Sequence, residues 1–397
     1  MVTIPLPPGV GFGAVDNPEW SCSVAAAVLQ CVLPVLAAGA SSEGLIQLTL
    51  DVAAGSTVTL TPTISDGSGP PIAGTPLVIT VQPQPAGVSD LFVDRADLVL
   101  LGNALLTCDP AANFCVEARD APANAPPGQV DKSAQQMVYI DVDADPTTFN
   151  SSTATLAMPP GAEVLLARLT WGGSVQAGTG GRPAPDGSAR DVVLLRGPVA
   201  AAPVPVTATS LSPDPTGNAR YMAVADVTGV VQTNGPGAYT VANLQTGTGR
   251  NGFGGWALEV LYRDPAAPLR VVALSDQIAT VDRGGRASVT LPGLAPSAVD
   301  RPLKLSFAAV EGDFGVVPEA VSANGVALAN PFNAVNNPFN SSISSPAARA
   351  PAFVNNFGFD MDQFAMTVTA GATGVVIDIS SSQDRFRLGT VSLVVPL

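Results

Sequence analysis

The chain has 397 residues, a formal net charge of −14 and no histidine. The missing imidazole excludes Ser-His-Asp and Cys-His catalysis and histidine metal sites, and the acidic surface excludes nucleic acid and membranes as favoured partners. Apolar residues make up 46% of the chain but aromatic residues only 5%, and 39 glycines and 37 prolines interrupt it. This composition favours short strands between many turns, so we predict an all-β fold.

The most apolar segment near the N-terminus is SCSVAAAVLQCVLPVLAAGA, residues 21–40. A membrane span needs about 20 uninterrupted apolar residues, and an export signal needs a basic region before its apolar run. Gln30 and Pro34 interrupt this segment, and no Lys or Arg occurs before Arg95. We therefore predict folded chain here, and we expect the sequence to start within a mature, exported protein.

The four cysteines form two close pairs, Cys22 with Cys31 and Cys108 with Cys115. A two-residue turn at residues 26–27 would place Cys22 opposite Cys31 in a hairpin, where a disulfide can close. Ala-Ala is a poor sequence for such a turn, so a longer loop is the alternative, and two free buried thiols are the alternative to a bond. We predict two disulfides and an oxidising, extracytoplasmic location.

Runs of alternating apolar residues predict strands along the whole chain, in three units. Residues 1–86 form a small sandwich that ends at the Pro- and Gly-containing run PQPAG, and two larger units cover residues 87–265 and 266–397. The larger units share an order of segments: TATLAMPPGAEVLLARLTWGG matches RASVTLPGLAPSAVDRPLKLSFAAVEG, and GGWALEVLYRD matches RLGTVSLVVPL. Each copy would close with a strand that rejoins its first sheet, as in jelly-roll sandwiches.

These segments resemble bacterial exported surface proteins that carry DUF-eleven repeats. The N-terminal match consists of VTIPLPPGVGF, EWSCSV, LQCVLPVLAAGAS and GLIQLTLDV, and residues 90–397 resemble the large β region that accompanies such repeats, through YIDVDADPTTFNSSTATL, GAEVLLARLTWGG, AYTVANLQTGTG and VNNFGFDMD. The resemblance implies a small Ig-like sandwich followed by two larger jelly-roll-like sandwiches, on the cell surface. It implies no chemistry.

One departure from the repeat pattern concerns the first strands. A complete repeat of this kind begins with two further strands ahead of VTIPL, and they are absent from this sequence. An open sandwich exposes unpaired backbone groups and apolar core, which a strand from a neighbouring chain would cover. The alternative is a repeat that is simply cut at this point.

Asp141, Asp143 and Asp145 in YIDVDADP are the candidate metal ligands. If the segment is a strand, the three carboxylates share one face, where a calcium ion would relieve their repulsion. The segment lacks the glycine and glutamate of an EF-hand loop. A solvated strand face is the alternative.

Two further groups suggest carbohydrate chemistry. Asp360, Asp362, Glu311 and Asp313 could supply a glycosidase with its two carboxyls, but nothing in the sequence fixes their separation. The tryptophans of LTWGG and GGWALEV could stack on sugars, but glycine pairs beside them favour buried residues against a closely packed neighbouring sheet. We expect no catalytic residues.

The chain has two lysines, Lys132 and Lys304. An intramolecular isopeptide bond would need a buried lysine beside an asparagine and an acid. Lys304 alternates with leucines and should face away from them. We therefore do not expect such a bond.

Together these features predict a non-enzymatic structural or adhesive protein of the cell surface or extracellular space, such as a component of a fibre, stalk or surface layer. Its expected partners are other copies of the chain, joined by strand exchange through the open N-terminal sheet, and surface glycans. The alternative is a module that binds carbohydrate or calcium, and calcium is then the one expected cofactor.

Overall fold

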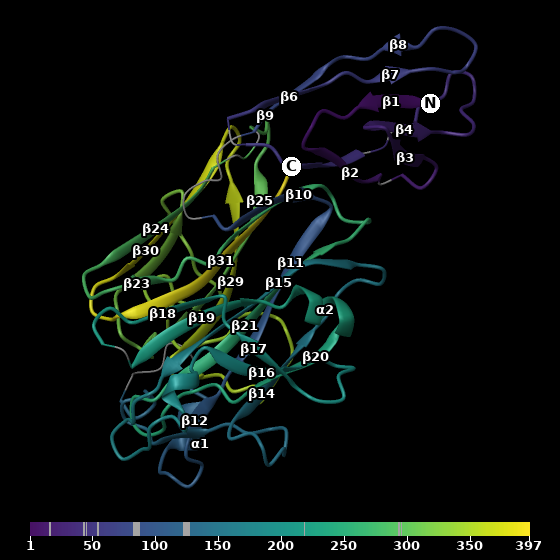
Figure 1. The fold of residues 1–397 in the computed structure, drawn as a ribbon. Coiled ribbons are helices and arrows are strands. Elements are labelled where there is room, and N and C mark those ends of the chain that lie inside the picture. The colour runs from purple at the N-terminus through teal and green to yellow at the C-terminus, as the bar shows by residue number, and fades with distance from the viewer. Residues whose placement is uncertain are drawn as a thin grey trace. The chain divides into compact units, whose positions relative to one another are not determined.

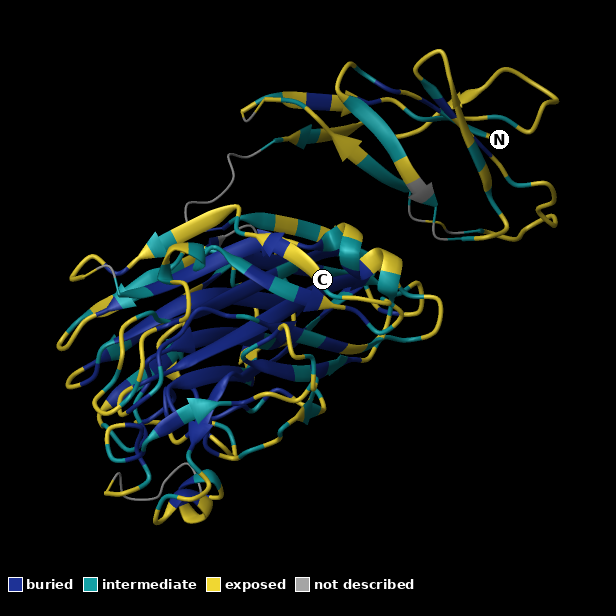
Figure 2. Ribbon diagram, turned by 60° about the horizontal axis from the view of Figure 1, so that its bottom comes forward, coloured by how far each residue is buried: buried dark blue, intermediate teal, exposed yellow. Residues whose placement is uncertain are grey.

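The computed structural model describes residues 1–397 except 16, 43, 45, 54, 82–87, 122–127, 218, 293 and 295. The chain divides into two compact units, Met1–Gln84 and Pro85–Leu397. Strands make up almost all of the regular structure, as predicted (Figure 1). The strands of the large unit are mostly buried, whereas those of the small unit are mainly half-buried or exposed (Figure 2).

The N-terminal unit is a small sandwich of nine short strands. They are β1 (Val2–Pro5), β2 (Val10–Val15), β3 (Ser21–Ala25), β4 (Val28–Val32), β5 (Ile46–Leu50), β6 (Thr57–Leu60), β7 (Thr63–Ile64), β8 (Ile72–Ala73) and β9 (Leu77–Thr80). One sheet has the order β3-β4-β1-β7-β8, while β2–β5 and β6–β9 are separate two-stranded sheets. The buried core is correspondingly small and consists of Ile4, Leu6, Leu29, Cys31, Val58 and Leu60.

The β3–β4 hairpin has the predicted register and disulfide. Cys22 lies opposite Cys31, with Cα atoms 4.0 Å apart, and the two are bonded. The turn has two residues, Ala26 and Ala27, whose φ angles are 48° and 58°. A two-residue hairpin turn of this kind needs positive φ at both positions, so the strand pairing overrides the poor preference of alanine for that conformation.

The first half of the large unit is a sandwich with jelly-roll strand order. Its sheets are β11-β21-β15-β19-β18 and β17-β16-β20-β14-β28. The strands are β11 (Ala96–Ala104), β14 (Ser151–Leu156), β15 (Glu163–Ser174), β16 (Val192–Arg196), β17 (Val204–Thr207), β18 (Ser210–Pro213), β19 (Arg220–Asp226), β20 (Gly237–Ala242), β21 (Gly254–Arg263) and β28 (Arg349–Ala350). Short elements flank them: β12 (Leu106–Cys108), α1 (Cys115–Arg119), β13 (Met137–Tyr139), a 3-10 turn (Gly187–Ala189) and α2 (Thr228–Asn234).

The second half repeats this topology. Its sheets are β10-β22-β31-β25-β29, with β23 also paired to β31, and β24-β30-β26-β27. The strands are β10 (Asp90–Asp94), β22 (Arg270–Ser275), β23 (Ala279–Val281), β24 (Arg286–Pro292), β25 (Arg301–Val310), β26 (Glu319–Ala323), β27 (Val326–Ala327), β29 (Phe359–Val368), β30 (Gly374–Ser381) and β31 (Phe386–Pro396). The two inner sheets correspond strand by strand, β11-β21-β15-β19 to β22-β31-β25-β29. The sequence predicted that the two halves share an order of segments, and the structure shows that they share a strand order.

The predicted boundary at residue 265 does not separate two independent units. The chain from Pro85 onward is one compact unit, because β10 joins the sheet of the second sandwich through β22, and β28 joins the first through β14. The inner sheets also pack face to face around a shared core that includes Leu98, Leu261, Val272, Phe359 and Val394. Sheets buried on both faces need apolar residues at nearly every position, as in β21 and β31.

Glycine allows the closest approach between the two inner sheets. A Cβ atom on Gly255 of β21 would overlap the ring of Phe359 on β29. We expect Gly255→Ala to lower the free energy of unfolding by about 1–3 kcal/mol, the usual cost of overpacking a core, measured as a lower urea midpoint. Gly229→Ala is the control, because Gly229 lies in α2 with open space around its Cα. Equal midpoints for the two variants would contradict this prediction.

The two large-unit tryptophans belong to the core. Trp171 on β15 lies opposite Trp256 on β21, and both side chains are buried. The indole of Trp171 donates a hydrogen bond to the Arg190 carbonyl at 3.1 Å, and that of Trp256 donates to Ser152 Oγ at 2.9 Å. Their burial is as predicted, and neither ring offers a face to a sugar.

Candidate functional site: an apolar groove in the N-terminal unit

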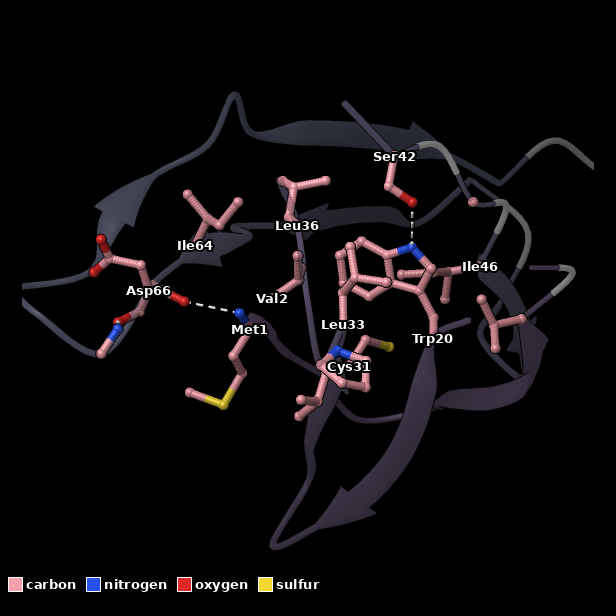
Figure 3. Close-up of a pocket in the computed structure, with 16 residues that line it drawn as sticks. Met1, Val2, Trp20, Cys31, Leu33, Leu36, Ser42, Ile46, Ile64 and Asp66 are labelled. Carbon is pink, nitrogen blue, oxygen red and sulfur yellow. Dashed lines mark hydrogen bonds between the residues drawn. The ribbon is translucent and has the colours of Figure 1, made fainter. Parts of the chain in front are cut away.

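The N-terminal unit contains a groove of about 790 Å³. It lies where β1 and β5 begin and β4 and β7 end, and its lining includes Val2, Trp20, Val32, Ile46 and Ile64 (Figure 3). The indole of Trp20 donates a hydrogen bond to Ser42 Oγ at 3.0 Å, which fixes the ring on the groove wall. The groove is therefore a preformed apolar surface between the layers of the sandwich.

The groove is open because the second layer of the sandwich is narrow. The five-stranded sheet of this unit faces the two-stranded sheet β2–β5, and among the described residues β5 pairs with β2 alone. The apolar residues of these two strands that pack against the core, Val10, Phe12, Ile46 and Leu48, are all only partly buried. A two-stranded sheet cannot cover the apolar face of a five-stranded one, so part of this face stays exposed to solvent.

The chemistry of the groove suits an uncharged, extended segment. Among the described lining residues, Asp66 has the one charged side chain. Exposed apolar side chains continue along its rim, where Leu36 and Ile64 are each about half exposed. An apolar segment that pairs with a free strand edge would gain backbone hydrogen bonds and bury these side chains together.

The same unit also carries an exposed apolar strand edge. In the described residues β8 pairs only with β7, and β9 only with β6. Ile72 on β8 and Leu77 and Val78 on β9 are more than half exposed, and the segment from Ile72 to Thr80 contains no charged residue. These edges are short, with two residues in β8 and four in β9, but exposed apolar edges are sites at which sheets add strands.

The predicted calcium ligands do not share a strand face. Asp141, Asp143 and Asp145 lie after β13 in a loop, because Ala144 takes a φ of 54° that breaks an extended strand. Each carboxylate accepts a short-range hydrogen bond: from Ser151 Oγ at 2.8 Å, from Thr148 Oγ1 at 2.9 Å and from the Thr147 backbone at 2.9 Å, respectively. Within the described parts of the chain, no group of three or more His, Cys, Asp or Glu residues is arranged to hold a metal. Calcium binding stays a prediction.

Three of the four carboxylates considered for glycosidase chemistry lie in the interior at one end of the second sandwich, whereas the side chain of the fourth, Asp313, is 29% exposed. Asp360 and Asp362 on β29 are completely buried, and Glu311 after β25 is nearly so. Burial raises the pKa of Glu311 and of Asp362 to about 7 and that of Asp360 well above its usual range. Because these groups lie inside the protein, they do not line an open sugar cleft.

The sequence analysis did not single out two members of this buried cluster, Glu319 and Asp384, and considered a third, Lys132, only for an isopeptide bond. Burial, together with the neighbouring charge of Asp384, raises the pKa of Glu319 to about 10. Lys132 contacts Asp313. The sequence carries a weak signal for Lys132 alone, since a lone lysine within a segment poor in basic residues is a candidate for a specific ion pair.

The second disulfide, between Cys108 and Cys115, joins β12 to α1 in a small buried cluster. With both bonds formed, no free cysteine is present in the described chain. Disulfides persist in non-reducing compartments. The described residues also include no helix with the length and apolar character needed to span a bilayer.

No protein-family model matches the chain, and no curated protein matches it.

Proposed function

We propose that this protein is an extracellular structural or adhesive building block, whose copies join when a strand edge of one copy occupies the groove of the next. The observation that supports this most directly is the open apolar groove, which lies in a sandwich with a narrow second layer. The absence of imidazole chemistry and the two disulfides agree with a protein that holds its shape outside the cell.

The occupant that fits the groove best is the β8–β9 edge of a second copy. The edge is apolar, exposed and uncharged from Ile72 to Thr80, and the groove is apolar with Asp66 at its margin. Residues 1–84 contain acidic residues but no Lys or Arg, so two N-terminal units repel each other at long range. An uncharged contact region avoids this repulsion where the two surfaces meet. Salt should screen the repulsion between the acidic residues outside the contact.

Groove and edge differ within one copy, so the contact is heterologous and can continue from copy to copy as a filament. We expect sedimentation velocity to show concentration-dependent association that increases with ionic strength, and electron microscopy to show linear assemblies. Ile64→Asp in the groove and Val78→Asp on the edge should each weaken association at least about tenfold, because each places a charge in an apolar contact. Both side chains are at least half exposed, so the fold tolerates the change.

Mixing the two variants provides the sharpest test. The Ile64→Asp copy keeps an intact edge and the Val78→Asp copy an intact groove, so the mixture should form a single-contact dimer that cannot extend. Val199→Asp is the control, because Val199 is 73% exposed in the large unit, and it should assemble like the unchanged protein. A protein that stays monomeric at all concentrations and salt levels would contradict the proposal.

A further inference from the structure

Lys132 is a buried lysine that connects the two jelly-roll sandwiches. It lies between α1 and β13 in the first sandwich, and its side chain is 5% exposed. The Nζ atom contacts Oδ1 of Asp313, which follows β25 in the second sandwich, and lies 3.4 Å from the Glu311 carbonyl oxygen. A Cβ on Gly358 would meet the Lys132 stem at 3.0 Å, so packing holds the amine against this one carboxyl group.

Asp360 supplies an acid next to this pair. Its side chain is completely buried, and a Cβ on Gly312, the residue before Asp313, would overlap its Oδ2 atom. The Oδ1 atom accepts a hydrogen bond from the Ser342 backbone at 3.2 Å, while Oδ2 has no hydrogen-bond partner among the described residues. Burial raises the pKa of Asp360 well above its usual range, which favours the neutral, proton-donating form of this carboxyl.

We propose that Lys132 and Asp313 become joined by an isopeptide bond, with Asp360 transferring protons in the reaction. Proton transfer from the Lys132 ammonium to the Asp313 carboxylate gives a neutral amine and a neutral acid. The amine then attacks Asp313 Cγ, while Asp360 protonates the departing oxygen and recovers a proton from Nζ. One C–N bond forms, one C–O bond breaks and one water molecule leaves, so no further reactant is needed.

The surroundings favour this reaction for two physical reasons. The Lys132 side chain is 5% exposed, and although the Asp313 side chain is 29% exposed, its Oδ1 atom is inaccessible to solvent. Little water therefore stabilises the separated charges, which lowers the cost of the neutral pair. The rigid contact also makes the reaction effectively unimolecular, which accelerates it strongly. The bond would fasten the two sandwiches together at the end where the loops after β25 and before β13 meet. This inference does not depend on assembly through the N-terminal groove.

The second lysine provides an internal comparison. Lys304 contacts Asp97, and its Nζ donates a hydrogen bond to the Leu98 carbonyl at 2.8 Å. This pair is about one quarter exposed on each side, and Asp97 also binds the guanidinium of Arg270 at 3.0 Å. Asp97 is no more exposed than Asp313, but water reaches the Lys304 amine, whose side chain is 24% exposed against 5% for Lys132, and Arg270 competes for Asp97. We therefore assign no bond to this pair.

Intact mass spectrometry of the full-length, reduced and denatured protein tests this proposal. We expect a mass one water molecule below that of the sequence, and a branched proteolytic peptide that links Lys132 to Asp313. Lys132→Arg should restore the full mass, whereas Lys304→Arg, the matched control, should keep the deficit. Asp360→Asn should also restore the full mass while near-ultraviolet circular dichroism shows a folded protein.

The unchanged protein decides the question even if a variant fails to fold. A full sequence mass for the unchanged chain would overturn the proposal and leave Lys132 and Asp313 as an ion pair. A deficit that persists in Lys132→Arg would place the loss of water elsewhere and would overturn it equally. A deficit that persists in Asp360→Asn would overturn the role of Asp360.

Discussion

Reduction of the Cys22–Cys31 disulfide is expected to unfold the N-terminal unit while the large unit stays folded. The reason is the size of the N-terminal core, which has six buried apolar residues and an incompletely covered sheet. A disulfide that closes a short loop contributes roughly 2–3 kcal/mol by restricting the unfolded chain, and small units with little buried surface have little stability beyond that. The large unit contains three extensive cores and does not depend on this bond.

Hydrogen exchange measured by mass spectrometry can follow both units in one sample. With reductant present, amides in β1 and β4 should lose protection, whereas those in β15 and β25 should keep it. Replacing Cys22 and Cys31 together by alanine should reproduce this result without reductant. The matched control replaces Cys108 and Cys115 by alanine, which should loosen α1 and β12 but leave the N-terminal unit protected. Persistent protection of β1 and β4 without the Cys22–Cys31 bond would contradict the prediction.

The sequence predicted the local geometry of the hairpin well, because strand pairing there depends on residues close together in the chain. The spacing of Cys22 and Cys31 determines a register in which the two face each other. The repeated strand order of the two jelly rolls was equally accessible, because each copy keeps its apolar segments in the same sequence. Both features follow from alternation and turn spacing.

The arrangement of the two jelly rolls could not be predicted in the same way. Whether a sheet buries one face or both depends on what packs against it. The strands β10 and β28 each pair with a sheet far away in the sequence, and both are too short for their sequences to indicate which strand they pair with. The loop at Ala144 was missed because the alternation of YIDVDAD indicated a strand, although Pro146 lies two residues after the left-handed Ala144. The partner of Lys132 could not be predicted, because Asp313 lies far along the chain and in the other sandwich. The groove was suggested only by the expectation of an open N-terminal sheet, and its lining needed the structure.

The stability of the large unit is expected to fall as pH rises from about 5 to about 9. Glu311, Glu319, Asp360 and Asp362 all have a pKa raised by burial, to about 7 for Glu311 and Asp362 and about 10 for Glu319. Each group binds its proton more tightly in the folded than in the unfolded chain, where the ordinary value for Glu is 4.5. The stability that each group contributes is therefore complete below its pKa in the unfolded chain. It decreases as the pH rises above that value and is lost above the pKa of the group in the folded protein.

Glu319 should account for the alkaline part of this decrease. The charges that face its carboxyl are those of Asp384 and Asp360, which oppose its ionisation, while Lys132 lowers the pKa of both neighbours. Glu319→Gln keeps an acceptor for the Phe339 backbone N–H, which lies 3.3 Å from Oε2, and removes the ionisable group. The variant should unfold with a pH slope that is shallower by up to about 1.4 kcal/mol per pH unit above neutrality.

Glu163→Gln separates this effect from the general repulsion of an acidic protein. Glu163 lies at the start of β15 with a side chain that is 71% exposed, so the variant loses the same charge from the surface. Chemical denaturation from pH 5 to pH 9 should give a nearly unchanged slope for Glu163→Gln and a reduced one for Glu319→Gln. Parallel curves for the two variants would show that Glu319 is ionised in the folded protein at neutral pH.

The proposed amide between Lys132 and Asp313 would remove the ammonium charge that lowers the pKa of Asp360 and Asp384. Lys132→Arg restores a positive charge at this position and lowers both pKa values again. The decrease in stability with rising pH should therefore occur at lower pH in Lys132→Arg than in the unchanged protein.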